Sequence, residues 1–297
     1  MSLELPFGEI NEALSRRPEN PRRADARALT ATIVVISPDE RLADATEALE
    51  AVGDRTGVRT ILISVGESTQ PKPRLVGNAV ALPGLVPAYV NNAIAALRLS
   101  SLPTVVWWRG GACEILDDLA GLADHVVLDA PEPLDGWKRA AKLFERASFT
   151  DLRWTRLTRW RTLMAQFFDM PEVQQAATGF HSLEVRTKDS AVAGLLAGWL
   201  KTALRLPRLE LRVSAPAGEA LIEQISFGDS EQQLTLQVAG RGGCVTTLAA
   251  VEGPQGHRRT VSLADERLQT LISEELRIRA RDRAFEAALT SYLETVR

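Results

Sequence analysis

The sequence is poor in the residues that most often bind metals or form disulfides. Of its 297 residues, two are cysteines, Cys113 and Cys244, and three are histidines. The histidines, His125, His181 and His257, stand far apart, and no H-E-x-x-H or C-x-x-C spacing occurs, so the sequence predicts no metal site. Two cysteines far apart in sequence are usual in a reducing cytoplasm, where each is most often a small buried side chain.

There is also no excess of one charge and no long apolar run. The 35 Lys and Arg residues nearly balance the 38 Asp and Glu residues, for a net charge of -3, which does not indicate nucleic-acid binding. The longest apolar helical pattern, Ala191–Leu200, has about half the length of a membrane span. Residues 1–17 lack the basic and apolar regions of a secretory signal. We therefore expect a cytoplasmic protein without membrane or nucleic-acid partners.

The motifs of several common enzyme classes are missing too. No G-x-G-x-x-G follows a predicted strand, and neither a Walker A lysine motif nor a G-x-S-x-G nucleophile elbow occurs. The GRGG segment at Gly240–Gly243 separates two predicted antiparallel strands and is typical of a hairpin turn. Acidic residues form no recognisable catalytic pair, although such pairs can assemble from distant positions. These observations favour a protein that is not an enzyme and carries no cofactor.

What is present first is an alternation of strand and helix patterns between about residues 28 and 146. Short β-branched segments such as Ala31–Ile36, Val58–Val65 and Pro103–Trp108 are separated by stretches with helical spacing, such as Arg41–Val52 and Val86–Leu99. Strands separated in this way indicate βαβ units and a mostly parallel sheet. We predict an N-terminal α/β domain over residues 1–148, in which helices cover the sheet.

After residue 149 the pattern changes. An aromatic, arginine-rich passage precedes a predicted strand, an apolar helix over Ser190–Arg205 and five further strands. Short turns with Gly, Asp or Pro join those strands, which favours antiparallel neighbours. Ala264–Val296 is helical almost throughout, with a break near residues 281–282. We predict a connecting helix region over residues 149–171, and an α+β domain over residues 172–297 with an antiparallel sheet and a long C-terminal helical segment.

Two adjacent tryptophans occur in the segment LPTVVWWRGG, residues 102–111. Because successive side chains of a strand point to opposite faces, Trp107 and Trp108 can both be buried only if helices cover both faces of the sheet. Arg109 then follows the carboxyl end of a strand, where open α/β sheets bind ligands. Acidic side chains at the start of the next predicted helix would repel a phosphate there. The pattern therefore favours an Arg109 that pairs locally or faces a partner.

The segment DLRWTRLTRWRTLMAQFFD, residues 151–169, combines aromatic residues with arginines. On a helix, Trp154 and Trp160 share one broad apolar side, which Arg156 and Arg161 border. The helix could begin at residue 151, or at Thr158 acting as N-cap. Such a helix can pack on its own protein, with arginines over aromatic rings. It can also form an interaction surface, because Trp and Arg most often anchor interfaces. A third alternative is an arginine-lined site for an acid or a phosphate.

Together, LPTVVWWRGG, LADHVVLDA (residues 122–130) and DLRWTRLTRWRTLMAQFFD resemble, in order and spacing, the glucose-6-phosphate dehydrogenase assembly protein (OpcA) family. The resemblance is specific over residues 102–169 and otherwise concerns the general layout. It implies a non-catalytic allosteric activator that binds glucose-6-phosphate dehydrogenase and favours its active oligomer in the oxidative pentose phosphate pathway. Arg159 stands where many relatives carry proline. The positions that match the family, and that we predict to bind the partner, are Trp107, Trp108, Arg109, Trp154, Arg156, Trp160 and Arg161.

The resemblance also raises redox control and leaves alternatives open. Cyanobacterial relatives are associated with thioredoxin-linked control, for which Cys113 and Cys244 are the available thiols. A disulfide would need their Cα atoms within about 7 Å, and two free structural thiols are the favoured alternative. The main alternative function is a sugar-phosphate or nucleotide-binding protein, or a lactonase-like enzyme, that uses the edge of the α/β sheet. Another is a scaffold for a different protein.

Overall fold

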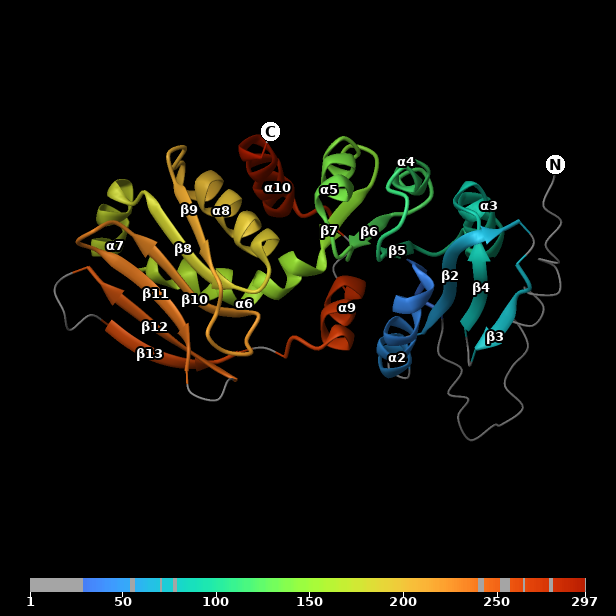
Figure 1. Cartoon of the computed structure of the whole chain (residues 1–297), viewed down its shortest axis with the longest axis horizontal. Coiled ribbons are helices and arrows are strands. Elements are labelled where there is room, and N and C mark those ends of the chain that lie inside the picture. The colour runs from blue at the N-terminus through green and yellow to red at the C-terminus, as the bar shows by residue number, and fades with distance from the viewer. Residues whose placement is uncertain are drawn as a thin grey trace. The chain divides into compact units, whose positions relative to one another are not determined.

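The structure is a computed structural model, which describes residues 29–53, 57–69, 71–76, 79–239, 243–251, 257–263, 265–277 and 280–296 (Figure 1). The chain forms two compact units, of which the first combines Met1–Leu152 with Arg267–Asp282 and the second combines Arg153–Glu266 with Arg283–Arg297. The chain therefore passes between the units three times. The domain boundaries predicted from the sequence lie at residues 148 and 171 and keep the C-terminal segment in one domain. None of the helices in the described residues has the length and apolar character needed to cross a membrane.

The first unit contains a seven-stranded sheet in the order β3-β4-β2-β1-β5-β6-β7. Its strands are β1 (Ala31–Ser37), β2 (Val58–Ser68), β3 (Arg74–Val76), β4 (Ala79–Leu85), β5 (Thr104–Trp108), β6 (His125–Leu128) and β7 (Ser148–Asp151). Six strands run parallel, and β3 pairs antiparallel with β4. The predicted α/β class with a mostly parallel sheet is confirmed. The strand patterns of the sequence did not predict β7.

Helices cover both faces of this sheet (Figure 1). They are the short η1 (Asp39–Arg41), α2 (Leu42–Gly53), α3 (Pro87–Leu97), α4 (Ile115–Leu119), α5 (Leu134–Ala141) and α9 (Leu268–Arg277). Trp107 belongs to a buried cluster with residues of α2 and α9. Trp108 packs against α5, where a Cβ atom placed on Gly136 would lie 2.7 Å from Cζ3 of the Trp108 ring. The two tryptophans therefore fill opposite layers, as the alternation of a strand requires.

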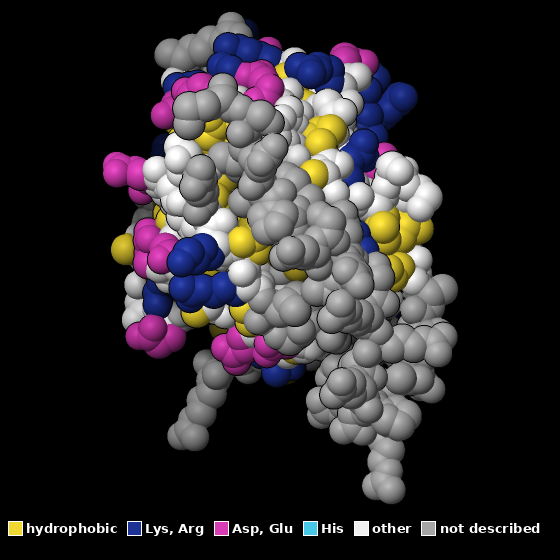
Figure 2. All heavy atoms as spheres, turned by 90° about the vertical axis from the view of Figure 1, so that its right-hand side faces the viewer, with side chains coloured by type: hydrophobic (Ala, Val, Ile, Leu, Met, Phe, Trp, Pro, Cys, Tyr) yellow, Lys and Arg dark blue, Asp and Glu magenta, His cyan; other side chains and the backbone are white. Residues whose placement is uncertain are grey.

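Charged side chains are mixed on the surface of the first unit that Figure 2 draws. The described Lys and Arg side chains on that face are interspersed with Asp and Glu, and the hydrophobic side chains form small separate areas. This distribution agrees with the small net charge of the sequence.

The second unit contains a six-stranded sheet in the order β13-β12-β11-β10-β8-β9. Its strands are β8 (Ser182–Thr187), β9 (Glu210–Ser214), β10 (Ile222–Gly228), β11 (Gln233–Val238), β12 (Cys244–Ala250) and β13 (His257–Ser262), and its helices are α6 (Leu152–Phe167), α7 (Pro171–Ala176), the short η2 (Ala177–Gly179), α8 (Ser190–Leu204) and α10 (Arg283–Thr295). Neighbouring strands are antiparallel except β8 and β9, which run parallel. The predicted antiparallel arrangement is wrong for β9, because α8 carries the chain back to the same end of the sheet before β9 begins. The predicted hairpin turn over residues 240–243 lies, except for Gly243, outside the described residues.

One face of this sheet is covered by helices. Leu183, Ile225 and Leu236 point to this inner face and are fully buried, and α8 contacts β8 and β9. Close packing of α8 on α10 depends on glycine, because a Cβ atom on Gly198 would lie 2.1 Å from the carbonyl oxygen of Ala288. The opposite, outer face of the sheet carries the alternate side chains, as expected of an antiparallel sheet with one covered face.

Candidate functional site

The strand order of the first sheet reverses between β1 and β5. From β1 the chain builds β2 and β4 on one side, and it then returns to build β5, β6 and β7 on the other. In open parallel sheets, ligands bind beyond the carboxyl ends of the strands at such a reversal. The residues that follow β1, β5 and β6 at this edge are Pro38, Arg109 and Asp129.

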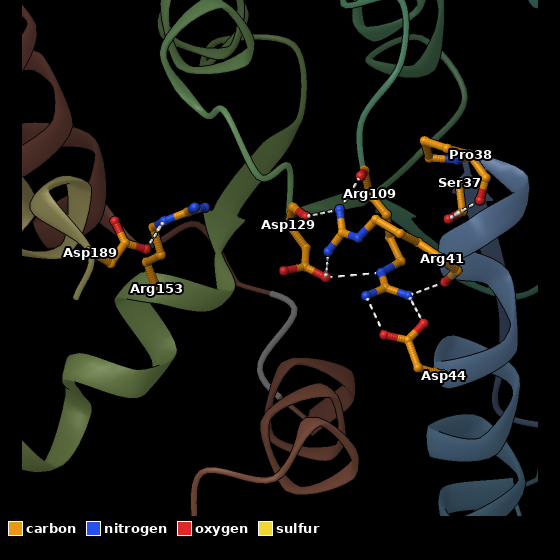
Figure 3. Close-up of polar contacts among 8 residues, drawn as sticks. All are labelled: Ser37, Pro38, Arg41, Asp44, Arg109, Asp129, Arg153 and Asp189. Atoms are coloured by element: carbon orange, nitrogen blue, oxygen red, sulfur yellow. Dashed lines mark hydrogen bonds and ion pairs between the residues drawn. The ribbon is translucent and has the colours of Figure 1, made fainter. Parts of the chain in front are cut away.

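Ion pairs and hydrogen bonds connect the residues at this edge (Figure 3). Arg109 is 2% exposed, and its Nε lies 2.9 Å from Oδ2 of Asp129. The two terminal nitrogens of the same guanidinium bind both carboxylate oxygens of Asp44, on α2. Arg41 donates from Nη1 to the carbonyl oxygen of Asp129 at 2.9 Å, and its Nη2 lies 3.4 Å from Oδ2 of Asp129. We call Arg41, Asp44, Arg109 and Asp129 the switch-point cluster.

The switch-point cluster is balanced in charge, because two arginines meet two aspartates. Hydrogen bonding to Arg109 lowers the pKa of Asp44 below its usual value. Burial alone would lower the pKa of Arg109, but Asp44 and Asp129 outweigh burial and the pKa is raised. The guanidinium also lies 4.8 Å from the centroid of the Trp107 ring. Arg109 therefore pairs locally, as predicted, and its Nε and both terminal nitrogens are engaged by the protein's own carboxylates.

The arginine-rich segment forms the continuous helix α6, which begins at Leu152 directly after β7. The start near residue 151 is confirmed, and the predicted alternative of an N-cap at Thr158 is wrong, because Thr158 lies inside the helix and is exposed. Trp154 and Trp160 are 2% and 1% exposed. At the end of β7 the buried carboxylate of Asp151 accepts a hydrogen bond of 2.7 Å from the indole of Trp137.

Two arginines of α6 lie partly exposed beside this buried aromatic side. The guanidinium carbon of Arg161 is 3.5 Å from the centroid of the Trp154 ring, which is a close cation–π contact. Burial raises the pKa of Glu266, while the charge of Arg156 and the indole of Trp160 act to lower it. The arginine-over-ring packing expected from the sequence is therefore present for Arg161.

The predicted partner-binding residues differ in what they can offer to another molecule. Trp107, Trp108, Arg109, Trp154 and Trp160 are all 3% exposed or less. They fill the interiors of their own units and therefore present no surface to a partner in this structure. Their roles here are packing and, for Arg109, ion pairing. Arg156 and Arg161 are partly exposed. Partner binding through these two arginines stays a prediction.

The two cysteines are free and partly exposed. Burial raises the pKa of the Cys113 thiol, and the charges of Glu114 and Asp135 raise it further, so the reactive thiolate is disfavoured. The redox role of Cys113 and Cys244 stays a prediction. Within the residues that the structure describes, no three or more His, Cys, Asp or Glu side chains are grouped to hold a metal ion.

Three members of the switch-point cluster, Arg41, Asp44 and Asp129, were not predicted from the sequence. Only Asp129 had a recognisable signal, since it follows a predicted strand as Arg109 does. His125 also has buried polar partners. The Nδ1 of His125 lies 3.0 Å from Oγ of Ser148, and its Nε2 lies 3.1 Å from Oε2 of Glu275, on α9. These contacts give His125 a structural role.

Comparison with known proteins confirms the resemblance to the OpcA family. Residues 147–289 match a family model that describes the C-terminal domain of the glucose-6-phosphate dehydrogenase subunit. The chain is 23% identical over 261 residues to the "Putative OxPP cycle protein OpcA" of Nostoc punctiforme, which covers 72% of this chain and 55% of that protein. It is 27% identical over 161 residues to the protein of the same name from Synechocystis sp., covering 51% of this chain and 34% of that protein. The chain thus spans about half the length of the first relative and a third of the second.

A solved structure shares the fold. The aldose-aldose oxidoreductase from Caulobacter crescentus, complexed with glycerol, matches with a TM-score of 0.52 over 91% of this chain and 96% of that chain. The sequences are 8% identical, so the likeness concerns the fold alone.

Proposed function

We propose that this chain is a non-catalytic partner of glucose-6-phosphate dehydrogenase that favours the assembled, active form of the enzyme in the oxidative pentose phosphate pathway of the cytoplasm. One observation carries the proposal, namely the match of residues 147–289 to a family described as a subunit of that dehydrogenase. The names of the curated relatives, which refer to the OxPP cycle, support the same pathway.

The geometry of the first sheet supports the non-catalytic part of the proposal. At the reversal of the strand order, Arg109 is buried and engaged by Asp44 and Asp129. A phosphate that approached Arg109 would have to displace one of these carboxylates, and it would meet the negative charge of the other. This arrangement argues against the alternative function, a sugar-phosphate or nucleotide binder or lactonase-like enzyme that uses this edge.

The proposal assigns the contact with the dehydrogenase to the exposed parts of Arg156 and Arg161 on α6. Both residues lie in the matched segment. The Trp154 ring holds the Arg161 guanidinium at 3.5 Å, so this side chain would lose less freedom on binding than an unsupported one. Arginine is also enriched among the residues that dominate binding energy. Trp154 and Trp160 would then act as positioning residues beneath the surface.

Activation requires the chain to bind the active form of the enzyme more tightly than the inactive form. A hundredfold shift of that equilibrium corresponds to a difference in binding free energy of about 2.7 kcal/mol. This amount is within reach of one or two well-placed arginines, because a single hot-spot side chain contributes about 2 kcal/mol or more.

The test combines purified dehydrogenase with the full chain and measures binding by pull-down, oligomer size by light scattering, and the rate of NADP reduction. We expect Arg156→Ala and Arg161→Ala to weaken binding and activation while the circular dichroism spectrum is retained. Arg208→Ala is the matched control, because Arg208 is an exposed arginine of the same unit outside α6. Variants that activate like the wild type would remove these arginines from the interface.

A wild-type chain that neither binds nor activates the dehydrogenase would overturn the proposal itself. The alternative function is tested separately by thermal shift with glucose 6-phosphate, 6-phosphogluconate and NADP. A ligand bound by the folded state alone raises the melting temperature, and a clear shift with one of these compounds would favour the alternative.

A further inference from the structure

The outer face of the six-stranded sheet carries two adjacent rows of side chains without charge in its central strands. Gln224, Gln237, Thr246 and Thr260 are successive register partners across β10, β11, β12 and β13. In the neighbouring row, Thr235 on β11 pairs with Leu248 on β12. All six side chains are partly or fully exposed, whereas the alternate residues of these strands, such as Leu236 and Val245, are fully buried.

This distribution differs from that of an ordinary solvated sheet face. In the described residues, no Lys, Arg, Asp or Glu occupies the outer positions of β11 and β12, or those of β10 that pair with β11. Charges appear instead toward the two edges of the sheet. Glu184 and Arg186 share the outer face of β8, and Glu210 and Arg212 share that of β9, each pair two positions apart. Arg258 lies on β13. A centre depleted of charge and a charged rim are the usual composition of a protein–protein contact.

The chemistry of the centre suits a surface that meets its own copy. Threonine and glutamine side chains each carry a donor and an acceptor, so identical rows can satisfy one another across a twofold axis. Charges of a single sign could not do so. The rim brings acidic and basic side chains together, so that it does not repel a second copy as a whole.

The area of the outer face is also large enough for a contact between two copies. Six strands about 4.8 Å apart, with about 3.3 Å per residue along each strand, make a face of roughly 24 by 20 Å. Two such faces together bury about 1,000 Å² in projection, which reaches the lower limit of a specific interface before the relief of the side chains is counted.

We infer that the outer face of the six-stranded sheet is the contact between two copies of this chain, packed sheet against sheet about a twofold axis. This contact does not depend on the proposed function, since it needs no dehydrogenase. It would leave α6 unobstructed by the sheet-to-sheet contact, because the chain directly after α6 lies on the inner side, where Phe168 packs on Phe227.

Sedimentation velocity of the full chain, without dehydrogenase, tests the inference. We expect the wild type to be dimeric at micromolar concentration. Thr246→Arg and, independently, Thr235→Arg place charge at the centre of the contact and should each raise the dimer dissociation constant more than about tenfold. Thr162→Arg is the control, because Thr162 is an exposed threonine on α6. Circular dichroism and thermal melting would verify that all three variants fold.

Each outcome decides the question. A wild-type dimer that both outer-face variants weaken and the control retains supports the inference. A wild-type chain that stays monomeric at all concentrations, a dimer that either outer-face variant leaves unweakened, or a dimer that the control weakens as much, overturns it. If the chain is monomeric and Thr246→Arg instead abolishes binding to glucose-6-phosphate dehydrogenase, the inference is also overturned, and the face belongs to the dehydrogenase.

Discussion

The switch-point cluster makes a prediction about which of two carboxylates matters more to stability. Asp44 and Asp129 both bind Arg109, and Asp44 does so through both of its oxygens. Their exposures differ, however, because the side chain of Asp44 is 55% exposed and that of Asp129 is 10% exposed. We expect the more buried carboxylate, that of Asp129, to contribute more to the free energy of unfolding. The perturbation is the isosteric replacement of each carboxylate, Asp129→Asn and Asp44→Asn.

The expected magnitudes follow from what each change leaves behind. Asp129→Asn leaves the buried Arg109 with a partly exposed partner only and also removes an ion pair to Arg41. Breaking a fully buried pair costs about 3–5 kcal/mol, and the remaining partner Asp44 reduces this, so we expect a loss of about 2–3 kcal/mol. Asp44→Asn removes an ion pair that solvent screens, for which a loss below about 1 kcal/mol is expected.

Urea denaturation followed by tryptophan fluorescence measures both losses. Trp107, Trp108 and Trp137 report on the first unit, and Trp154, Trp160 and Trp199 on the second. Equal losses for the two variants, or a larger loss for Asp44→Asn, would refute the reasoning that burial decides the strength of these pairs.

Further predictions concern pH, packing and thiol chemistry. The pKa of Asp44 is lowered in the folded state. The ionised carboxylate therefore stabilises the fold above the unfolded-state pKa of about 3.9, and this stabilisation is lost as the pH falls through the folded-state pKa. The difference in unfolding free energy between wild type and Asp44→Asn, measured by urea titration, should therefore disappear in acid. Gly198→Ala should lower the free energy of unfolding by about 1–3 kcal/mol, since its Cβ would meet the carbonyl oxygen of Ala288. Gly179→Ala serves as control, because the nearest contact of its Cβ would be 3.7 Å away. Similar melting temperatures for the two variants would contradict this prediction. Because the pKa of the Cys113 thiol is raised, iodoacetamide should modify it more slowly at neutral pH than it modifies an unhindered model thiol, as measured by mass spectrometry; rapid modification, or a disulfide to Cys244 under mild oxidation, would instead support redox control.

The sequence predicted best what depends on local periodicity. The alternation of a strand was enough to place Trp107 and Trp108 in opposite buried layers, and the apolar side of α6 was identified from helical spacing. β7 was missed because it has four residues, SFTD, of which only Phe149 is strongly apolar. Its burial comes from its place beside β6, which no local pattern contains.

Features that join distant residues were not predictable in the same way. The switch-point cluster brings Arg41 within hydrogen-bonding distance of a residue 88 positions later, so it becomes visible only when the strand order is known. The direction of β9 likewise depends on a helical crossover rather than on its own residues. Redox activity and partner binding were not tested by the fold, because both are properties of encounters with other molecules.

The position of α9 has a consequence for how the protein can be divided. This helix lies between β13 and α10 in sequence, yet it packs with α2, and its buried Leu271, Ile272 and Leu276 complete the interior of the first unit. A fragment cut to residues 147–289 would carry that apolar surface without the helix that covers it, and it would end inside α10. Residues 147–289, which sequence comparison matches to one domain, are therefore not a self-sufficient folding unit. Experiments on this protein should use the full chain.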